Sequence, residues 1–196
     1  MKTSKQFMFL LLGSFAISGF KSLDEIPGGW FKAGDVPDSY RMGLDSKVFS
    51  HGQKSATIES LVTEINGFTT LMQTCYALHY AGKRIKMTGY IRSENVAGWS
   101  GMWLRIDAKT GQDFLGFDNM EDRPVQGTSD WTKCEIIMDV PPESGTLNFG
   151  VLLAGTGKIW FDNVTFEVVN SLAAGETIEI EATIEQKKPL NLDFEE

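Results

Sequence analysis

The chain has 196 residues, 42% of them hydrophobic, so it is long enough for one domain with a real core and too apolar to be disordered throughout. Eighteen Lys and Arg against 26 Asp and Glu give a formal net charge of −8, which offers no electrostatic footprint for a nucleic-acid backbone. Two cysteines exclude a dense disulfide framework and any four-cysteine zinc or iron–sulfur site.

Residues 1–18 have the three parts of a secretory signal peptide. Lys2 and Lys5 form a short basic region, Phe7–Phe20 is an apolar run, and Ala16-Ile17-Ser18 supplies small residues near its end. The apolar run is too short to span a bilayer comfortably. We therefore expect an exported protein, periplasmic or extracellular, with no membrane span after the signal peptide is cleaved.

From Trp30 onward, short segments alternate apolar and polar residues with a period of two, the pattern of half-buried β-strands. Turn signals such as Lys109-Thr110-Gly111 and Pro141–Gly145 separate these segments, and none has the 3.6-residue apolar period of a long helix. The pattern predicts an all-β domain over residues 19–170, a sandwich in preference to a barrel. We expect strands at 56–62, 70–78, 85–92, 102–107, 134–140, 147–153 and 159–169.

The last of these strands changes parity part-way along. Its apolar residues share one parity up to residue 161 and the other from residue 164: Ile159, Phe161, Val164, Phe166 and Val168. Either both faces of the strand are buried, or an extra residue near Asp162 and Asn163 shifts the register. A plain kink would have no further role. A bulge would aim the Asp162 carboxylate away from the ladder, which predicts a small cation site with structural calcium; no other cofactor is expected.

Residues 171–196 differ in composition from the rest of the chain. They contain seven acidic residues and two lysines, so they contribute −5 of the net charge. We interpret them as an acidic linker or an appended strand rather than a second domain. The alternating run at 177–185 fits either interpretation.

The polar parity of two predicted strands supplies the main candidate ligand site. Trp103, Arg105 and Asp107 lie on one face of their strand, and Tyr90 and Arg92 have the corresponding parity on an earlier strand. Aromatic rings stack on the C–H groups of sugars while charged groups bind hydroxyls, so such a face suits a carbohydrate. The alternative is that Trp103 packs under a loop and Arg105 pairs with Asp107 or Asp118.

The densest polar cluster is Phe117–Pro124, which follows this face in the chain. It is interpreted first as a structural clasp in which Arg123 neutralises Asp118. Alternatively, Asp118, Asn119 and Arg123 contribute to the ligand site. A glycoside hydrolase that uses Asp118 or Glu121 together with Asp107 is the weaker third interpretation, because neighbouring carboxylates usually cap turns or are solvated.

The two cysteines, Cys75 and Cys134, lie on different predicted strands. In an exported protein an even number of cysteines permits a disulfide, provided that the two strands are neighbours. The alternative is two buried thiols that pack as small hydrophobic side chains.

Several motifs resemble a bacterial family of galactose-binding-like jelly-roll domains. They occur in the family's order over residues 28–169, and the block at 118–124 with its flanking tryptophans is the most specific. The motifs are Gly29-Trp30, Tyr40-x4-Asp45, Gly52–Ala56, Leu71–Gln73, Tyr80–Arg84, Met102–Asp107, Phe117–Pro124, Gly127-Thr128-x2-Trp131 and Gly155–Val164. The resemblance implies a jelly-roll β-sandwich similar to carbohydrate-binding modules, which are found beside helix-turn-helix regulators and in exported hydrolases.

One motif departs from the family's order. Such domains often begin with an Asn-Leu-x-Phe-Glu strand, whereas here Asn191–Glu195 stands near the C-terminus. Either a second domain would start there, or the segment completes this domain's own sheet.

We conclude from the sequence that the chain is an exported, non-catalytic module whose ligand is a carbohydrate. The alternative is a structural accessory domain that binds a partner exported protein within a larger hydrolase or peptidase.

Overall fold

The computed structural model describes residues 25–110, 114–171 and 188–196. Their strands confirm the predicted all-β class, and no α-helix occurs among them. The predicted signal peptide and the run at 177–185 lie outside the described residues. The elements are β1 (Phe31–Gly34), η1 (Pro37–Ser39), β2 (Tyr40–Asp45), β3 (Ser55–Ser60), β4 (Phe68–Tyr76), η2 (Ala77–His79), β5 (Lys83–Ala108), β6 (Phe114–Asp118), β7 (Val125–Val140), β8 (Ser144–Ala154) and β9 (Lys158–Ser171).

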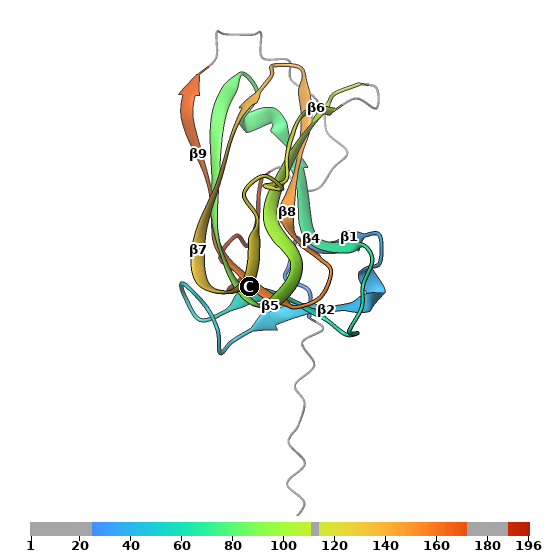
Figure 1. Ribbon diagram of the computed structural model, residues 1–196. Helices are drawn as coiled ribbons and strands as arrows, with labels where there is room; N and C mark the ends of the chain where they lie inside the picture. The colour runs from blue at the N-terminus through green and yellow to red at the C-terminus, as the bar shows by residue number, and fades with distance from the viewer. Residues whose placement is uncertain (1–24, 111–113, 172–187) are drawn as a thin grey trace, which may run out of the picture.

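Strand β5 belongs to both layers of a jelly-roll sandwich (Figure 1). Its first half pairs with β7 and β9, and its second half pairs with β8 and β6. The two halves are separated by a bend at Asn95, where φ is 53°. One layer is therefore β2-β3-β9-β5-β7 and the other is β1-β4-β8-β5-β6. The sequence predicted two separate strands where the chain forms one bent strand.

The core lies between the two halves of β5. A Cβ placed on Gly89 in the first half would meet the sulfur of Met102 in the second half and the ring of Phe161. The inward-facing residues of both halves are fully buried, and they alternate with outward-facing ones as a strand requires. These buried residues include Ile85, Met87, Ile91, Met102, Leu104 and Ile106. The glycine at 89 keeps the two layers close enough for this contact.

The predicted bulge in β9 is confirmed. Thr88 of β5 pairs with Thr165 of β9, and Tyr90 pairs with Asp162, so two steps along β5 correspond to three along β9. Within this interval Asn163 has a φ of 51°. The extra residue lets both parities of β9 reach the core, with Ile159 and Phe161 before it and Val164 after it.

A disulfide between Cys75 and Cys134 is not formed; both thiols are free and buried. Cys75 lies on β4, which pairs with β1 and β8, whereas Cys134 lies on β7 in the other layer. The premise that their strands are neighbours is therefore wrong. Burial raises the pKa of Cys75 to about 12 and that of Cys134 to about 11, as expected for thiols that pack as small hydrophobic side chains.

The end of the chain packs into the domain. Phe194 is fully buried, with its ring centroid 5.0 Å from that of Trp30 and 5.8 Å from that of Phe161. Residues 188–196 form turns rather than a strand, so they close the core without extending the sheet. Among the described parts of the chain, no helix is long and apolar enough to cross a membrane.

Candidate functional site

The outward face of the β1-β4-β8-β5-β6 layer holds a row of polar side chains with exposed phenylalanines at its edges; we call it the phenylalanine-edged face. Cross-strand pairing sets Thr74, Asn148, Arg105 and Phe117 in one row, and Thr146, Asp107 and Phe114 in the next. Phe31 flanks Met72 at the far edge. Phe31, Phe114 and Phe117 are 44%, 63% and 50% exposed, whereas core phenylalanines of the chain are fully buried.

Hydrogen bonds join the polar row into one network across three strands. Arg105 Nε donates to Asp107 Oδ1 at 2.8 Å, and Arg105 Nη2 donates to Asp107 Oδ2 at 2.9 Å. Asn148 Nδ2 donates to Asp107 Oδ2 at 2.8 Å, and its Oδ1 accepts from Thr74 Oγ1 at 2.7 Å. The bidentate ion pair holds the guanidinium in a fixed orientation on an otherwise accessible face.

Trp103 shares this face but is not the exposed ring that the sequence predicts. It is only 8% exposed, and its indole Nε1 donates to Thr70 Oγ1 at 2.7 Å. The cross-strand partner of Trp103 is Gly150, which has no side chain, so the indole can lean across β8 to reach Thr70 on β4. Trp103 therefore packs beneath the other side chains of the face and leaves little ring surface for a ligand.

Tyr90 and Arg92 do not join Trp103, which corrects the predicted site. They lie on the first half of β5, outward from the opposite layer, because the bend in β5 places the two halves back to back. The guanidinium of Arg92 lies 5.7 Å from the Trp160 ring, and Lys158 Nζ lies 4.7 Å from it. Parity alone shows which residues point outward, but not from which layer.

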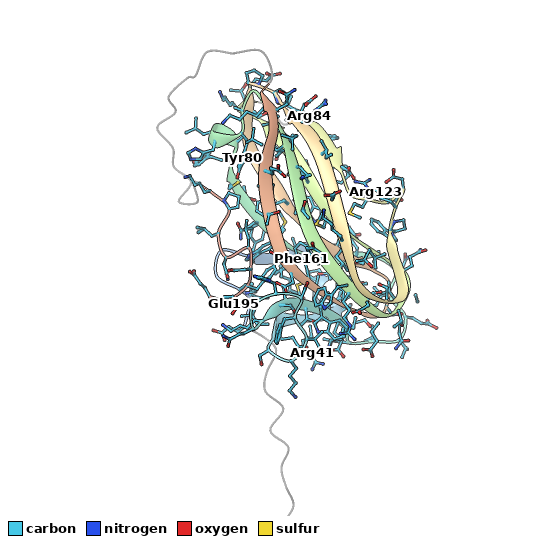
Figure 2. All side chains as sticks on the ribbon, turned by 90° about the vertical axis from the view of Figure 1, so that its left-hand side faces the viewer. Arg41, Tyr80, Arg84, Arg123, Phe161 and Glu195 are labelled. Carbon is cyan, nitrogen blue, oxygen red and sulfur yellow. The ribbon has the colours of Figure 1, made fainter. Side chains whose placement is uncertain are left out.

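The face that holds Tyr90 and Arg92 is covered by ion pairs, and we call it the ion-pair face. The pairs include Arg41 with Glu59, Arg84 with Asp139, Lys86 with Glu167 and Lys133 with Glu135. Arg41 and Arg84 mark its two ends (Figure 2). Trp160 is buried beneath this charged layer and donates from Nε1 to Asp45 Oδ2 at 2.8 Å. Charges here are matched to one another rather than left open for a ligand.

The loop between β6 and β7 is the structural clasp that the sequence favours. Arg123 Nη2 donates to Asp118 Oδ2 and Arg123 Nη1 to Asp122 Oδ1, both at 2.7 Å, and Nη2 also reaches the carbonyl of Glu135 at 3.2 Å. The bond to Asp118, more than any other cause, raises the pKa of Arg123. Asn119 Oδ1 accepts from the backbone of Glu121 at 3.1 Å. All three predicted loop residues therefore shape the turn.

Two shallow depressions border this clasp. One, of about 650 Å³, is lined by Phe117, Asp118, Asn119, Glu121, Asp122, Arg123, Ile137 and Met138. The other, of about 540 Å³, lies along β7 between Pro124 and Glu135. Neither depression is lined by Trp103, Arg105 or Asp107, so the loop and the polar row do not form one cavity.

Asp162 lies in the β9 bulge, but N–H donors surround it. Its Oδ2 accepts from the backbone of Ser50 at 2.7 Å and His51 at 2.8 Å, and its Oδ1 accepts from Asn163 at 2.6 Å. Burial raises the pKa of Asp162, and these donors oppose the rise. Among the described residues, no three or more Asp, Glu, His or Cys side chains lie together in an arrangement that could hold a metal ion. Asp162 thus anchors the loop before β3, and calcium there stays a prediction.

Sequence reasoning missed most members of the phenylalanine-edged face, among them Thr74, Asn148 and Phe117. Asn148 stands in the apolar run of β8. The available signal was that this run contains one side-chain amide, at a position whose parity points outward. Phe117 was seen only as part of the acidic loop. Its pairing with Arg105 depends on a bulge between Ile106 and Asp107, which the sequence does not mark.

Comparisons with known proteins place this fold among jelly-roll sandwiches. The CBM22-1 xylan-binding domain of Paenibacillus barcinonensis Xyn10C superposes with a TM-score of 0.53 at 13% identity over 76% of this chain and 92% of that domain. The Stig cyclase Fisc of Fischerella sp. gives 0.51 at 16% identity over 75% and 88%. The active domain of tailspike protein 4 of bacteriophage CBA120 gives 0.56 at 11% identity over 76% of this chain and 20% of the tailspike chain. These likenesses establish the fold alone.

The chain is also similar in sequence to a bacterial regulator. Over 169 residues it is 36% identical to the uncharacterized HTH-type transcriptional regulator YbfP of Bacillus subtilis (strain 168). The matched region is 86% of this chain and 57% of the regulator, so the chain spans little more than half the length of that relative. The chain matches no protein-family model.

Proposed function

We propose that the chain is a non-catalytic carbohydrate-binding module whose ligand lies on the phenylalanine-edged face. The observation that carries the proposal is the hydrogen-bonded row of Thr74, Asn148, Arg105 and Asp107, set between exposed phenylalanines on one open face of the sandwich. Solved domains with this fold include xylan-binding modules, so the fold is compatible with a polysaccharide ligand.

The chemistry of the row suits a sugar. Arg105 keeps one edge of its guanidinium on Asp107, and its side chain is 44% exposed, so N–H groups remain available to hydroxyl oxygens. Phe117 lies beside it and supplies an apolar ring for the C–H face of a pyranose. Because Trp103 is buried, the stacking role predicted for it passes to the exposed phenylalanines.

Two carboxylates of the hydrolase alternative, Asp107 and Asp118, are already engaged in hydrogen bonds, which supports a binding role. Both oxygens of Asp107 accept hydrogen bonds from Arg105 and Asn148, and Asp118 is held by Arg123 and by the backbone of Met120. We expect no release of sugar from model glycosides. Hydrolysis that disappears in Asp118→Asn would contradict the non-catalytic assignment.

A glycan array followed by calorimetry on xylo-oligosaccharides tests the proposed ligand. Arg105→Ala should weaken binding by about 10-fold or more, because a hydrogen bond to a charged group is worth roughly 1.5–3 kcal/mol. Arg92→Ala is the matched control: it removes the same side chain from the ion-pair face and should leave affinity unchanged. The proposal fails if no glycan binds, or if the two variants weaken binding equally.

A second candidate role is the ligand-sensing part of a regulator, favoured by the 36% identity to the Bacillus subtilis protein. It would use the same face but act inside the cell, whereas the predicted signal peptide would export the module. Expression of the full chain, followed by mass spectrometry of its N-terminus, separates the two. Cleavage near Ser18 in an exported fraction supports the exported module, and an intact N-terminus in the cytoplasm supports the regulator role.

A further inference from the structure

Residues 188–196, which we call the C-terminal segment, lie on the rest of the domain in the way a bound peptide lies in its receptor. The side-chain amide of Gln73 makes two hydrogen bonds with the backbone of Leu190: Nε2 donates to the carbonyl at 2.6 Å, and Oε1 accepts from the N–H at 3.0 Å. Trp30 Nε1 donates to the carbonyl of Asn191 at 3.0 Å. The backbone of Val164 donates to the carbonyl of Leu192 at 2.9 Å. Recognition along three consecutive residues is therefore by backbone.

One side chain of the segment supplies the apolar anchor. Phe194 is fully buried between Trp30 near the start of the domain and Phe161 on β9. Figure 2 shows Phe161 in the half of the sandwich where Glu195 also lies. A single deeply buried aromatic with backbone contacts on one side is the usual pattern of a peptide anchor in its pocket.

The site recognises Glu195, the residue after Phe194, through its charged carboxylate. Glu195 Oε1 accepts from the backbone N–H of Gln53 at 2.6 Å and of Lys54 at 3.0 Å, and Lys54 Nζ donates to the carbonyl of Glu195 at 2.7 Å. Gly52 leaves room for this carboxylate, because a Cβ at that position would collide with it. The loop therefore selects an acidic residue directly after the aromatic anchor.

We propose that the domain carries a peptide-binding site, filled here by its own C-terminal segment, which accepts the same segment from a second copy of the chain. Each of these contacts joins a residue within 30–164 to a residue within 190–195. None of them requires that the two parts belong to the same copy of the chain. Residues 172–187 separate the segment from β9, and exchange of such an element between copies is a low-cost route to dimers.

Backbone strain in the segment weakens its binding to the site, whichever copy supplies the site. Asn191 and Phe194 have φ values of 44° and 60°, and for a bulky residue such as Phe this conformation costs free energy. The contacts outweigh this cost, which is the same whether the segment binds in its own chain or in a second copy. Closure within one chain then wins at low concentration, and exchange grows as protein concentration rises.

The first experiment opens the intact protein without removing the segment. A protease recognition sequence is inserted after Gly175, the folded full chain is cut, and a fluorescent synthetic peptide of residues 188–196 is added. Anisotropy should report entry of the labelled peptide. The matched peptide with Phe194→Ala should bind at least about 100-fold more weakly, since loss of a buried Phe costs roughly 3–5 kcal/mol. Failure of the labelled peptide to enter, or equal binding of both peptides, overturns the proposal.

The second experiment tests the second copy directly, using two uncut full-length variants. Phe194→Ala has a defective segment and an intact site, whereas Gly52→Val has an intact segment and a site weakened because its new Cβ displaces the Glu195 carboxylate. Light scattering should find each variant monomeric alone and, at high concentration, a mixed species of twice 21.8 kDa. A mixture that stays monomeric overturns exchange between copies. Neither result depends on carbohydrate binding, so the two proposals fail separately.

Discussion

The two outward faces of the sandwich share strand β5, yet they differ in how their charged side chains are paired. On the ion-pair face, cations and carboxylates pair with one another between strands or along one strand, and Arg92 and Lys158 lie over the ring of the buried Trp160. On the phenylalanine-edged face, one ion pair is tied to Asn148 and Thr74, and exposed rings stand at the edges.

The contrast teaches that an outward charge has different uses depending on its neighbours. Charges that satisfy one another across strands contribute solubility and a modest amount of stability. A guanidinium fixed on one side and open on the other, beside an exposed ring, can bind a ligand. The difference between the two faces is open to three measurements.

The largest effect is expected from Trp160→Ala on the ion-pair face. The side chain is 5% exposed and bonded to Asp45, so its loss should destabilise the domain by about 3–5 kcal/mol, read as a lower urea midpoint. Glycan affinity of the folded protein should not change. Loss of binding with little loss of stability would move the ligand site to this face.

A smaller effect is expected from Phe117→Ala on the other face. The ring is 50% exposed, so stability should change little, while glycan affinity should fall by up to about 10-fold, since an aromatic contact is worth roughly 0.5–1.5 kcal/mol. Phe49→Ala, which removes a phenylalanine that is 40% exposed in the loop between β2 and β3, is the control. Equal behaviour of the two variants would contradict the assigned difference between the faces.

The smallest effect concerns acid and the ion-pair face. The hydrogen bond from Arg84 holds the pKa of Asp139 below 3.8, and the one from Lys133 holds the pKa of Glu135 below 4.5. Because these values are lower in the folded than in the unfolded chain, the stabilisation is complete above the unfolded values and is lost as pH falls through the folded ones.

Thermal melts across this acidic range test the assignment. The double variant Asp139→Asn, Glu135→Gln should lose less stability on acidification than the parent protein, and added salt should shrink the difference because both pairs are exposed. An unchanged pH dependence would show that these pairs contribute nothing measurable.

The sequence predicted the elements of the fold well and their assembly less well. Period-two alternation predicted β3, β4, β8, β9 and parts of β5 and β7, but it missed β1, β2 and β6. The parity change at Asp162 predicted the bulge in β9. Alternation cannot tell whether 85–92 and 102–107 are two strands or two halves of one. That ambiguity misplaced Tyr90 and Arg92, since the bend at Asn95 decides their layer.

The site was predicted only in part for a related reason. Arg105 and Asp107 were found together because they stand two residues apart on one strand. Asn148 and Thr74 come from β8 and β4, and only the register of those strands brings them to Asp107. The burial of Trp103 depends on Gly150 across the ladder, a pairing that no local pattern reveals.

The position of Phe194 has a consequence for the order of events during synthesis. Its partner Trp30 is made long before Phe194, so the two appear roughly 10–30 seconds apart at elongation rates of about 5–20 residues per second. Throughout that interval the growing chain lacks the side chain that packs against Trp30 in the folded domain. Final closure of the core can therefore begin only after residues 190–195 have left the ribosome.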